Sequence, residues 1–185
     1  MKHFIFFCIV FLNCYVSICQ ESQTKLPVEF KGTVIDTAGA IPGGGVPSFK
    51  MKIEKYTSDE DVLRFAKLLT EKGPDALASE LHDVKNGTFS IGSSFPYHVS
   101  ITRTFEKDGK RVVRALTDRP ITMSTRFGSL RDMDHPFGFI EIILDSTGNG
   151  AGQIVVATEI KINDGVLEME YSGLEPFRIT KVTAK

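Results

Sequence analysis

The segment Arg126–Gly138, RFGSLRDMDHPFG, holds the densest group of side chains in this chain that could do chemistry. Carboxylates and imidazoles bind divalent metals, and Asp132, Asp134 and His135 could supply them. On an extended chain, however, the two aspartates would point one way and His135 the other. Charged segments between strands, bounded by glycine and proline, are typically exposed loops. We therefore expect an exposed loop and no metal site, with Asp134 and His135 as the weak candidates for catalysis.

A nucleophilic triad can also be assembled from this region, using Ser129, His135 and either Asp134 or Asp118. The sequence around Ser129 does not support it, because it lacks the G-x-S-x-G turn that exposes a nucleophilic serine between a strand and a helix. A cofactor-free hydrolase that uses Asp and His side chains around residues 118–135 is therefore an alternative function and not the preferred one.

Some further patterns resemble known sites but are better explained as turns. TAGAIPGGGVP at 37–47 lacks the GK[ST] ending of a phosphate-binding loop. DSTGNG at 145–150 opens like a calcium loop, but its twelfth position is Val156 and not the required glutamate. NGT at 86–88 fits the N-glycosylation pattern, yet it directly follows a helical region. We expect a strand connection, a hairpin turn and a helix stop.

The most specific pattern is a pair of arginines on an apolar face. Asp108-Gly109 is typical of a two-residue hairpin turn, and such a turn places Arg103 opposite Arg114. Their neighbours on that face would be apolar, namely Val99, Ile101, Phe105, Val112 and Leu116. Like charges directly opposite each other in a sheet are destabilising unless something offsets them, so the pair needs an explanation.

Three explanations stay open. A three-residue turn would shift the pairing and send one arginine to the other face. Alternatively, both side chains could reach water past apolar neighbours at the margin of the sheet. Finally, an anion could lie between them, either an acidic side chain such as Asp118 or a glutamate, or a ligand carboxylate or phosphate. The last explanation predicts a ligand-binding site at Arg103, Arg114 and Asp118.

The elements that must position these residues are mainly β. Strand-like runs occupy residues 28–36, 48–56, 97–105, 111–117, 139–144, 153–162, 167–171 and 177–182. Tight turns link consecutive runs with one apolar face, which indicates an antiparallel sheet. In one run we expect a single shared face for Ile154, Val156, Ile160 and Ile162. We predict a mainly β (α+β) fold, an antiparallel barrel or a two-layer sandwich.

One helical hairpin is expected after the second strand, at about 58–85. Ser58 is a typical N-cap before three acidic residues. Apolar side chains then follow at helical spacing, namely Val62, Phe65, Ala66 and Leu69. Gly73 would end the first helix, and Pro74 would begin the second. The hairpin should cover an opening or an edge of the sheet.

Residues 1–19 are typical of a secretory signal, with a basic start and an apolar run of moderate length. Cleavage after Cys19 is expected, and lipidation of Cys19 is the alternative. All cysteines lie in this segment, at positions 8, 14 and 19, so the exported chain would have no disulfide and no thiolate ligand. We predict a periplasmic or secreted protein with a flexible leader at 20–27 and one domain at 28–185.

The composition also bears on which classes of partner the chain could bind. Lys and Arg number 22 and Asp and Glu 23, and this near-neutral balance is not typical of proteins that bind nucleic acid. No apolar run after the signal is long enough for a transmembrane segment. No motif for a cofactor is present. An oligomeric state cannot be predicted from these patterns.

Three stretches carry a resemblance: YTSDEDVLRFAKLLTEKGPDAL at 56–77, TDRPI at 117–121 and HPFGFIEIILDSTGNGAG at 135–152. In these the chain resembles a group of exported bacterial proteins known mainly as hypothetical proteins. The resemblance covers most of residues 28–185 and implies a cell-envelope or secreted setting. That group has no assigned activity, so no functional residue is carried over.

The preferred function is therefore an exported binding module and not an enzyme. Its partner would be a small acidic or amphipathic ligand, or a component of the cell envelope. Besides the hydrolase, a structural envelope protein without a pocket is a further alternative. A lined cavity would favour binding, and a histidine that meets a carboxylate in a cleft would favour hydrolysis.

Overall fold

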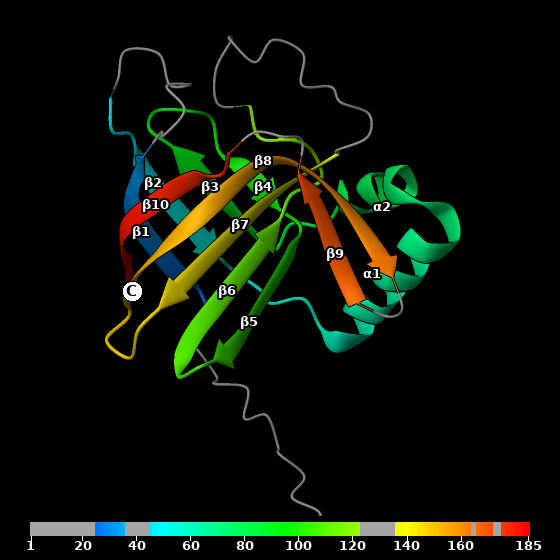
Figure 1. Ribbon diagram of the computed structural model, residues 1–185, viewed down its shortest axis with the longest axis horizontal. Helices are drawn as coiled ribbons and strands as arrows, with labels where there is room; N and C mark the ends of the chain where they lie inside the picture. Colours follow the sequence, from blue (N-terminus) through cyan, green and yellow to red (C-terminus); the bar gives the residue numbers. More distant parts are fainter. Residues whose placement is uncertain (1–24, 36–44, 123–135, 164–165, 172–174) are drawn as a thin grey trace, which may run out of the picture.

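The computed structural model describes residues 25–35, 45–122, 136–163, 166–171 and 175–185 (Figure 1). The strands are β1 (Val28–Ile35), β2 (Ser48–Ile53), β3 (Gly87–Ile91), β4 (Tyr97–Val99), β5 (Ile101–Lys107), β6 (Lys110–Leu116), β7 (Phe137–Leu144), β8 (Asn149–Asn163), β9 (Val166–Tyr171) and β10 (Phe177–Ala184). The helices α1 (Asp59–Lys72) and α2 (Pro74–Leu81) follow β2. This confirms the predicted mainly β fold with its inserted helical hairpin. Within these residues no helix is long and apolar enough to cross a bilayer.

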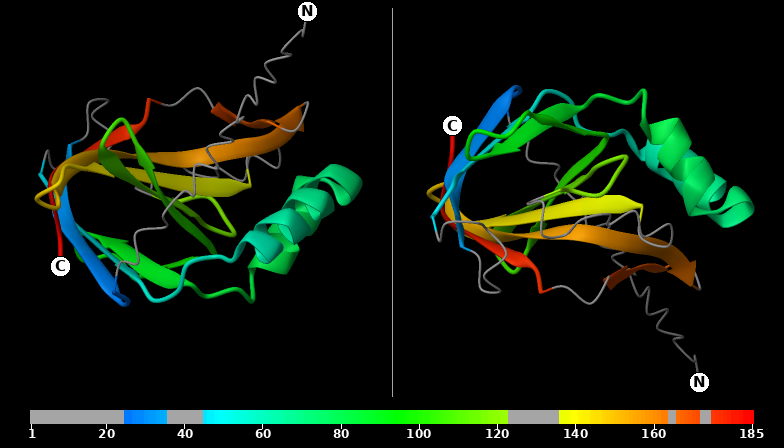
Figure 2. Two further views of the ribbon diagram at one scale, coloured as in Figure 1. Left: turned by 90° about the horizontal axis from the view of Figure 1, so that it is seen from below. Right: turned by 90° about the horizontal axis from the view of Figure 1, so that it is seen from above.

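All strands belong to one curled antiparallel sheet. Its order is β4-β3-β2-β1-β10-β8-β7-β6-β5, and β9 pairs with β8 beside this path. The described strands do not close into a barrel, because β4 and β5 form two separate ends. The halves of the sheet face each other, and α1 and α2 lie at the side where they diverge (Figure 2). Of the two predicted architectures, the result is closer to the sandwich.

The two faces of the sheet contribute to separate apolar cores. The first core lies between the facing halves and includes Phe30, Phe49, Ile140 and Ile154, all fully buried. The second core lies between the helices and the opposite face, here called the outer face. It contains Phe65, Leu69, Leu77 and Leu81 of the helices with Leu116, Phe137, Phe139, Val155 and Ile160 of the strands. Strand side chains alternate between faces, so β7 and β8 contribute to both cores, and the second core fixes the helices over the sheet.

A β-bulge changes which face of the sheet the side chains of β8 use. The register between β7 and β8 shifts between Phe137 and Phe139. Val156 therefore lies in the first core and Ile160 in the second. The prediction that Ile160 shares a face with Ile154 and Val156 was wrong, because an inserted residue reverses the alternation of a strand. The reversal turns Ile160 toward the helices.

The run predicted as one strand at 97–105 is divided at Ser100. β4 pairs with β3 and β5 pairs with β6, so the chain changes its partner strand at this residue. Ser100 is fully buried. Its amide donates to the Leu116 carbonyl at 2.8 Å and its hydroxyl to the Leu81 carbonyl at 2.9 Å. Because Leu81 ends α2, this junction fastens the helical hairpin to the sheet.

Asn86 completes this junction from within the fold. Its Nδ2 donates to the Thr57 hydroxyl at 3.0 Å and to the Ser100 carbonyl at 2.6 Å. The Thr57 hydroxyl also accepts the amide of Thr102 at 2.9 Å. One buried side chain thus joins the segment before α1, the segment after α2 and the start of β5. Buried and bonded in this way, the amide is not available to a glycan in the folded chain.

The helix boundaries agree with their predicted signals. The Ser58 hydroxyl accepts the amide of Asp61 at 3.1 Å and donates to its carboxylate at 2.9 Å, which lowers the pKa of that carboxyl. Gly73 has a φ of 82° between the two helices, a left-handed value that glycine adopts readily. Pro74 begins α2.

Candidate ligand-binding cleft

The hairpin that carries the arginine pair has the predicted register. Asp108 and Gly109 have φ values of 53° and 70°, as a two-residue hairpin turn requires. Arg103 pairs with Arg114, between the pairs Phe105/Val112 and Ile101/Leu116. The three-residue turn is therefore excluded, and both guanidinium groups belong to the outer face of the sheet.

A cleft lies between this face and the helices. Its volume is about 300 Å³. Arg103 and Arg114 line it, and every other lining residue is apolar: Val62, Phe65, Ala66, Leu69, Leu77, Ile101, Phe105, Ala115, Leu116, Phe139 and Ile160. α1 supplies one wall with a stripe at helical spacing, and β5 and β6 supply the facing wall. The predicted apolar face of α1 therefore forms part of this cleft.

The cleft has a polar end and an apolar end. Arg103 forms an ion pair with Asp59, the first residue of α1, so the arginines mark the end at which the helix begins. Leu69 lies ten residues further along α1, which is about 15 Å at the helical rise per residue. Leu69 and Leu77 are buried with Ile160 in the second core. An elongated ligand would therefore meet charge at one end and only apolar groups at the other.

Arg114 is oriented by two neighbours. Its Nε donates to Glu141 Oε2 at 2.8 Å, and its guanidinium lies 5.0 Å from the centre of the Phe105 ring. The Arg114 side chain is 43% exposed and that of Glu141 only 16%. Within the described part of the chain, its two Nη groups have no hydrogen-bond partner. They are held in place and can still donate to a ligand.

Arg103 connects the sheet to the start of α1. Its Nη1 donates to the Thr57 carbonyl at 2.9 Å, and its Nη2 lies 2.6 Å from Asp59 Oδ1. The arginine side chain is 35% exposed and that of Asp59 85%. Each arginine thus has its own acidic partner and also reaches water. The observed arrangement agrees with the predicted partial exposure, and two separate acidic side chains offset the charges in place of one anion between the arginines.

Asp118 lies elsewhere, although it was predicted to join the arginines. Its carboxylate is 2.7 Å from Nδ1 of His82, and it does not line the cleft. The Asp118 side chain is 9% exposed and that of His82 is 71% exposed. Sequence reasoning missed this pair, because nothing local links the end of α2 to the segment after β6. No group of three potential metal ligands occurs among the described residues.

The other candidates, Ser129, Asp132, Asp134 and His135, lie outside the described residues. The same is true of residues 1–19 with the predicted signal. These predictions therefore remain predictions. The site residues that the structure brings together are Arg103 and Arg114.

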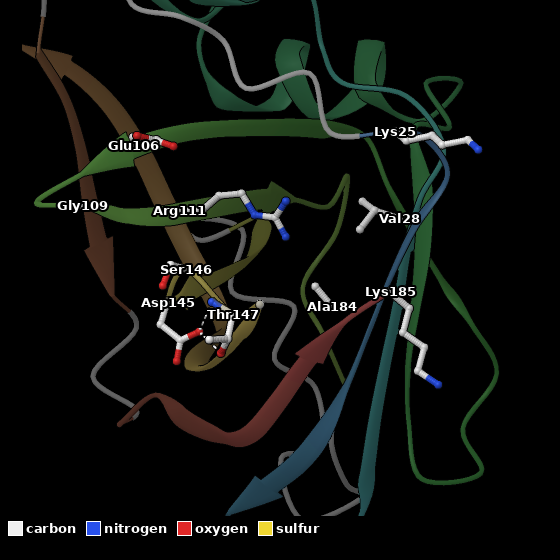
Figure 3. A pocket seen from close by; sticks show the side chains of 11 residues that line it. Lys25, Val28, Glu106, Gly109, Arg111, Asp145, Ser146, Thr147, Ala184 and Lys185 are labelled. Atoms are coloured by element: carbon white, nitrogen blue, oxygen red, sulfur yellow. Dashed lines mark hydrogen bonds between the residues drawn. The ribbon is translucent and has the colours of Figure 1, made fainter.

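A second hollow lies where the β5–β6 and β7–β8 hairpins turn (Figure 3). Its charged residues are Lys25, Glu106, Arg111, Asp145 and Lys185. Asp145 Oδ1 accepts the amides of Thr147 at 2.8 Å and Asn149 at 3.1 Å, as expected for a hairpin turn at DSTGNG. The hydrogen bond from the Thr147 hydroxyl, followed by the bonds from the backbone amides, lowers the pKa of this carboxyl. The hollow carries charges of both signs, and the Asp145 carboxylate is already hydrogen-bonded within the turn. It therefore does not favour one class of ligand.

No family model, curated protein or solved structure matches this chain. The function must therefore be argued from the cleft itself.

Proposed function

We propose that this protein binds a small amphipathic anion in the cleft between α1, α2 and the outer face of the sheet. The acidic head lies at Arg103 and Arg114, and the apolar tail extends toward Leu69 and Leu77. One observation carries the proposal: an apolar cleft whose only charged lining residues, within the described chain, are two arginines at one end.

The size of the cleft defines the length of the tail. A volume of about 300 Å³ has room for roughly ten non-hydrogen atoms at about 30 Å³ each. Each buried methylene contributes about 0.8 kcal/mol. A tail of roughly eight methylenes would contribute about 6 kcal/mol, which must offset the free-energy cost of association. A ten-carbon carboxylate such as decanoate is therefore a suitable probe.

The acidic partners of the arginines do not prevent binding of an anion. Asp59 is largely exposed, and ion pairs in water contribute little, so a ligand can compete for Arg103. Glu141 uses only the Nε edge of Arg114, which leaves the terminal nitrogens for a second acceptor. Charge-assisted hydrogen bonds to such an acceptor contribute about 1.5–3 kcal/mol.

We further propose that the protein is exported, as its first nineteen residues suggest, and acts outside the cytoplasm. The intact mass of protein recovered from the cell envelope or the medium would test this. A chain that still contains Cys19 would contradict plain cleavage. The cleft favours ligand binding over a purely structural role. The hydrolase alternative gains no support from Asp118, because its partner His82 is solvent-exposed and neither residue lines the cleft.

Filling the cleft should weaken binding. Ala66 lines the cleft on α1, so Ala66→Phe places an aromatic ring where the tail would lie. We expect the affinity for decanoate, measured by calorimetry, to fall at least about tenfold, the equivalent of losing two or more buried methylenes.

The matched control is Leu63→Phe. Leu63 lies on the same helix but is 71% exposed, so this variant should bind decanoate as the unaltered protein does. Thermal unfolding of both variants would establish that they are folded. Equal decanoate binding by Ala66→Phe and Leu63→Phe would place the ligand outside the cleft and refute the proposal.

A further inference from the structure

A row of polar side chains leads away from the cleft across the outer face. Arg114 pairs with Glu141, Glu141 with Gln153, and Gln153 with Arg178. These residues lie on β6, β7, β8 and β10, which are neighbours in the sheet. The first and last members of the row are three strand spacings apart, or about 14 Å between backbones.

The far part of this row lines an open trough. Charged and polar residues surround it, namely Lys110, Glu141, Asp145, Asn149, Gln153 and Arg178, and Ile143 and Ala151 contribute to its floor. Glu141 lines the trough and is hydrogen-bonded to Arg114, which lines the cleft. The trough and the cleft therefore adjoin at the Arg114–Glu141 pair, and one ligand can occupy both.

The charges along the row indicate which polar groups the head of such a ligand would carry. A simple carboxylate would contact Arg103 and Arg114 and would not extend along the row past Glu141. The Glu141 carboxylate is only 16% exposed, but it can accept hydrogen bonds from hydroxyl groups. Arg178, on β10, then offers positive charge at the far end of the row, whereas Lys110 lies on β6, the strand of Arg114. The complement is an acceptor at Arg114, a hydroxyl at Glu141 and an anion at Arg178.

Resting on the function proposed above, we infer that the ligand is a monoacyl lipid with a hydroxylated phosphate head. Its acyl chain fills the cleft, and its ester carbonyl accepts from Arg114. A free hydroxyl donates to Glu141. The phosphate lies at Arg178, whose guanidinium can form two parallel hydrogen bonds to its oxygens. The long side chains of Arg114 and Arg178 shorten the distance that the head must span.

Three probes distinguish the contribution of the head to affinity from that of the tail. They are decanoate, glycerol 3-phosphate and 1-decanoyl-glycerol 3-phosphate, and each is titrated calorimetrically into the full chain. We expect the acylated phosphate to bind at least about tenfold more tightly than decanoate, as an added charge-assisted contact implies. Arg178→Met should remove that gain and leave decanoate binding unchanged. Lys50→Met removes an exposed cation from β2, on the other half of the sheet, and should change neither affinity.

Each other outcome decides between the two proposals. If decanoate binds and the acylated phosphate binds no more tightly, or if Arg178→Met leaves the gain intact, the phosphate head is refuted while the amphipathic anion stands. If glycerol 3-phosphate alone binds as tightly as the acylated phosphate, the ligand is not a lipid. If neither decanoate nor the acylated phosphate binds, both proposals fail.

Discussion

Replacement of Asn86 by alanine should lower the free energy of unfolding by about 3 kcal/mol, the scale expected when a buried hydrogen-bonded group is lost and a cavity remains. The side chain is 6% exposed and donates two hydrogen bonds, to Thr57 and Ser100. Its removal leaves the Ser100 carbonyl without this donor in a buried site. Chemical denaturation of Asn86→Ala beside the unaltered protein measures the loss.

Two further variants show whether the amide itself is responsible. Asn86→Asp keeps the shape but replaces two donors with an acceptor beside the Ser100 carbonyl, so it should be less stable than Asn86→Ala at neutral pH. Burial raises the pKa of the introduced carboxyl, so part of the loss should be regained in acid, where this group is protonated. Thr88→Ala on neighbouring β3 should cost under about 1 kcal/mol. A loss for Asn86→Ala as small as that for Thr88→Ala would show that the junction does not hold the helical hairpin.

Arg114→Met should weaken the binding of decanoate by about tenfold or more, because one charge-assisted contact is worth about 1.5–3 kcal/mol. Glu141→Gln should have the opposite effect. It removes the negative charge next to Arg114 while retaining an acceptor for its Nε, so the affinity for decanoate should rise severalfold. Calorimetric titration of both variants provides the comparison.

Arg114→Met also leaves Glu141 without its cation, and Glu141 is mostly buried. The double variant Arg114→Met/Glu141→Gln removes this complication, since it has no unpaired carboxylate. It should be more stable than Arg114→Met and still bind decanoate weakly. If the double variant binds decanoate as tightly as Glu141→Gln alone, Arg114 does not hold the head of the ligand.

The arginine pair could be predicted from the sequence because its position depends on local chemistry. Asp108-Gly109 specifies a two-residue turn, and the turn then fixes every pairing between β5 and β6. The α1 boundary at Ser58 and the break at Gly73 were predictable for the same reason. The stripe at Val62, Phe65, Ala66 and Leu69 showed which face of α1 would be covered, although not that part of it would border a cleft.

The partners of the arginines could not be predicted, because they are set by tertiary contacts. Glu141 lies 27 residues from Arg114 in the chain, and Asp59 reaches Arg103 only because α1 begins beside β5. Asp118 was assigned to the wrong partner for the same reason, since the position of α2 brings His82 to it. The bulge in β8 has no clear signal in the sequence, and it reversed the expected side of Ile160.

The central claim is that the cleft selects an apolar tail with a negatively charged head. Calorimetric titration of the unaltered protein with decanoate and with decylammonium tests it most directly, because the two probes share a tail and differ in the sign of the head. Decanoate should bind at one site per chain, at least about tenfold more tightly than decylammonium, since the two arginines would repel a cation. Equal affinity for both probes, or no binding of decanoate, would contradict the account.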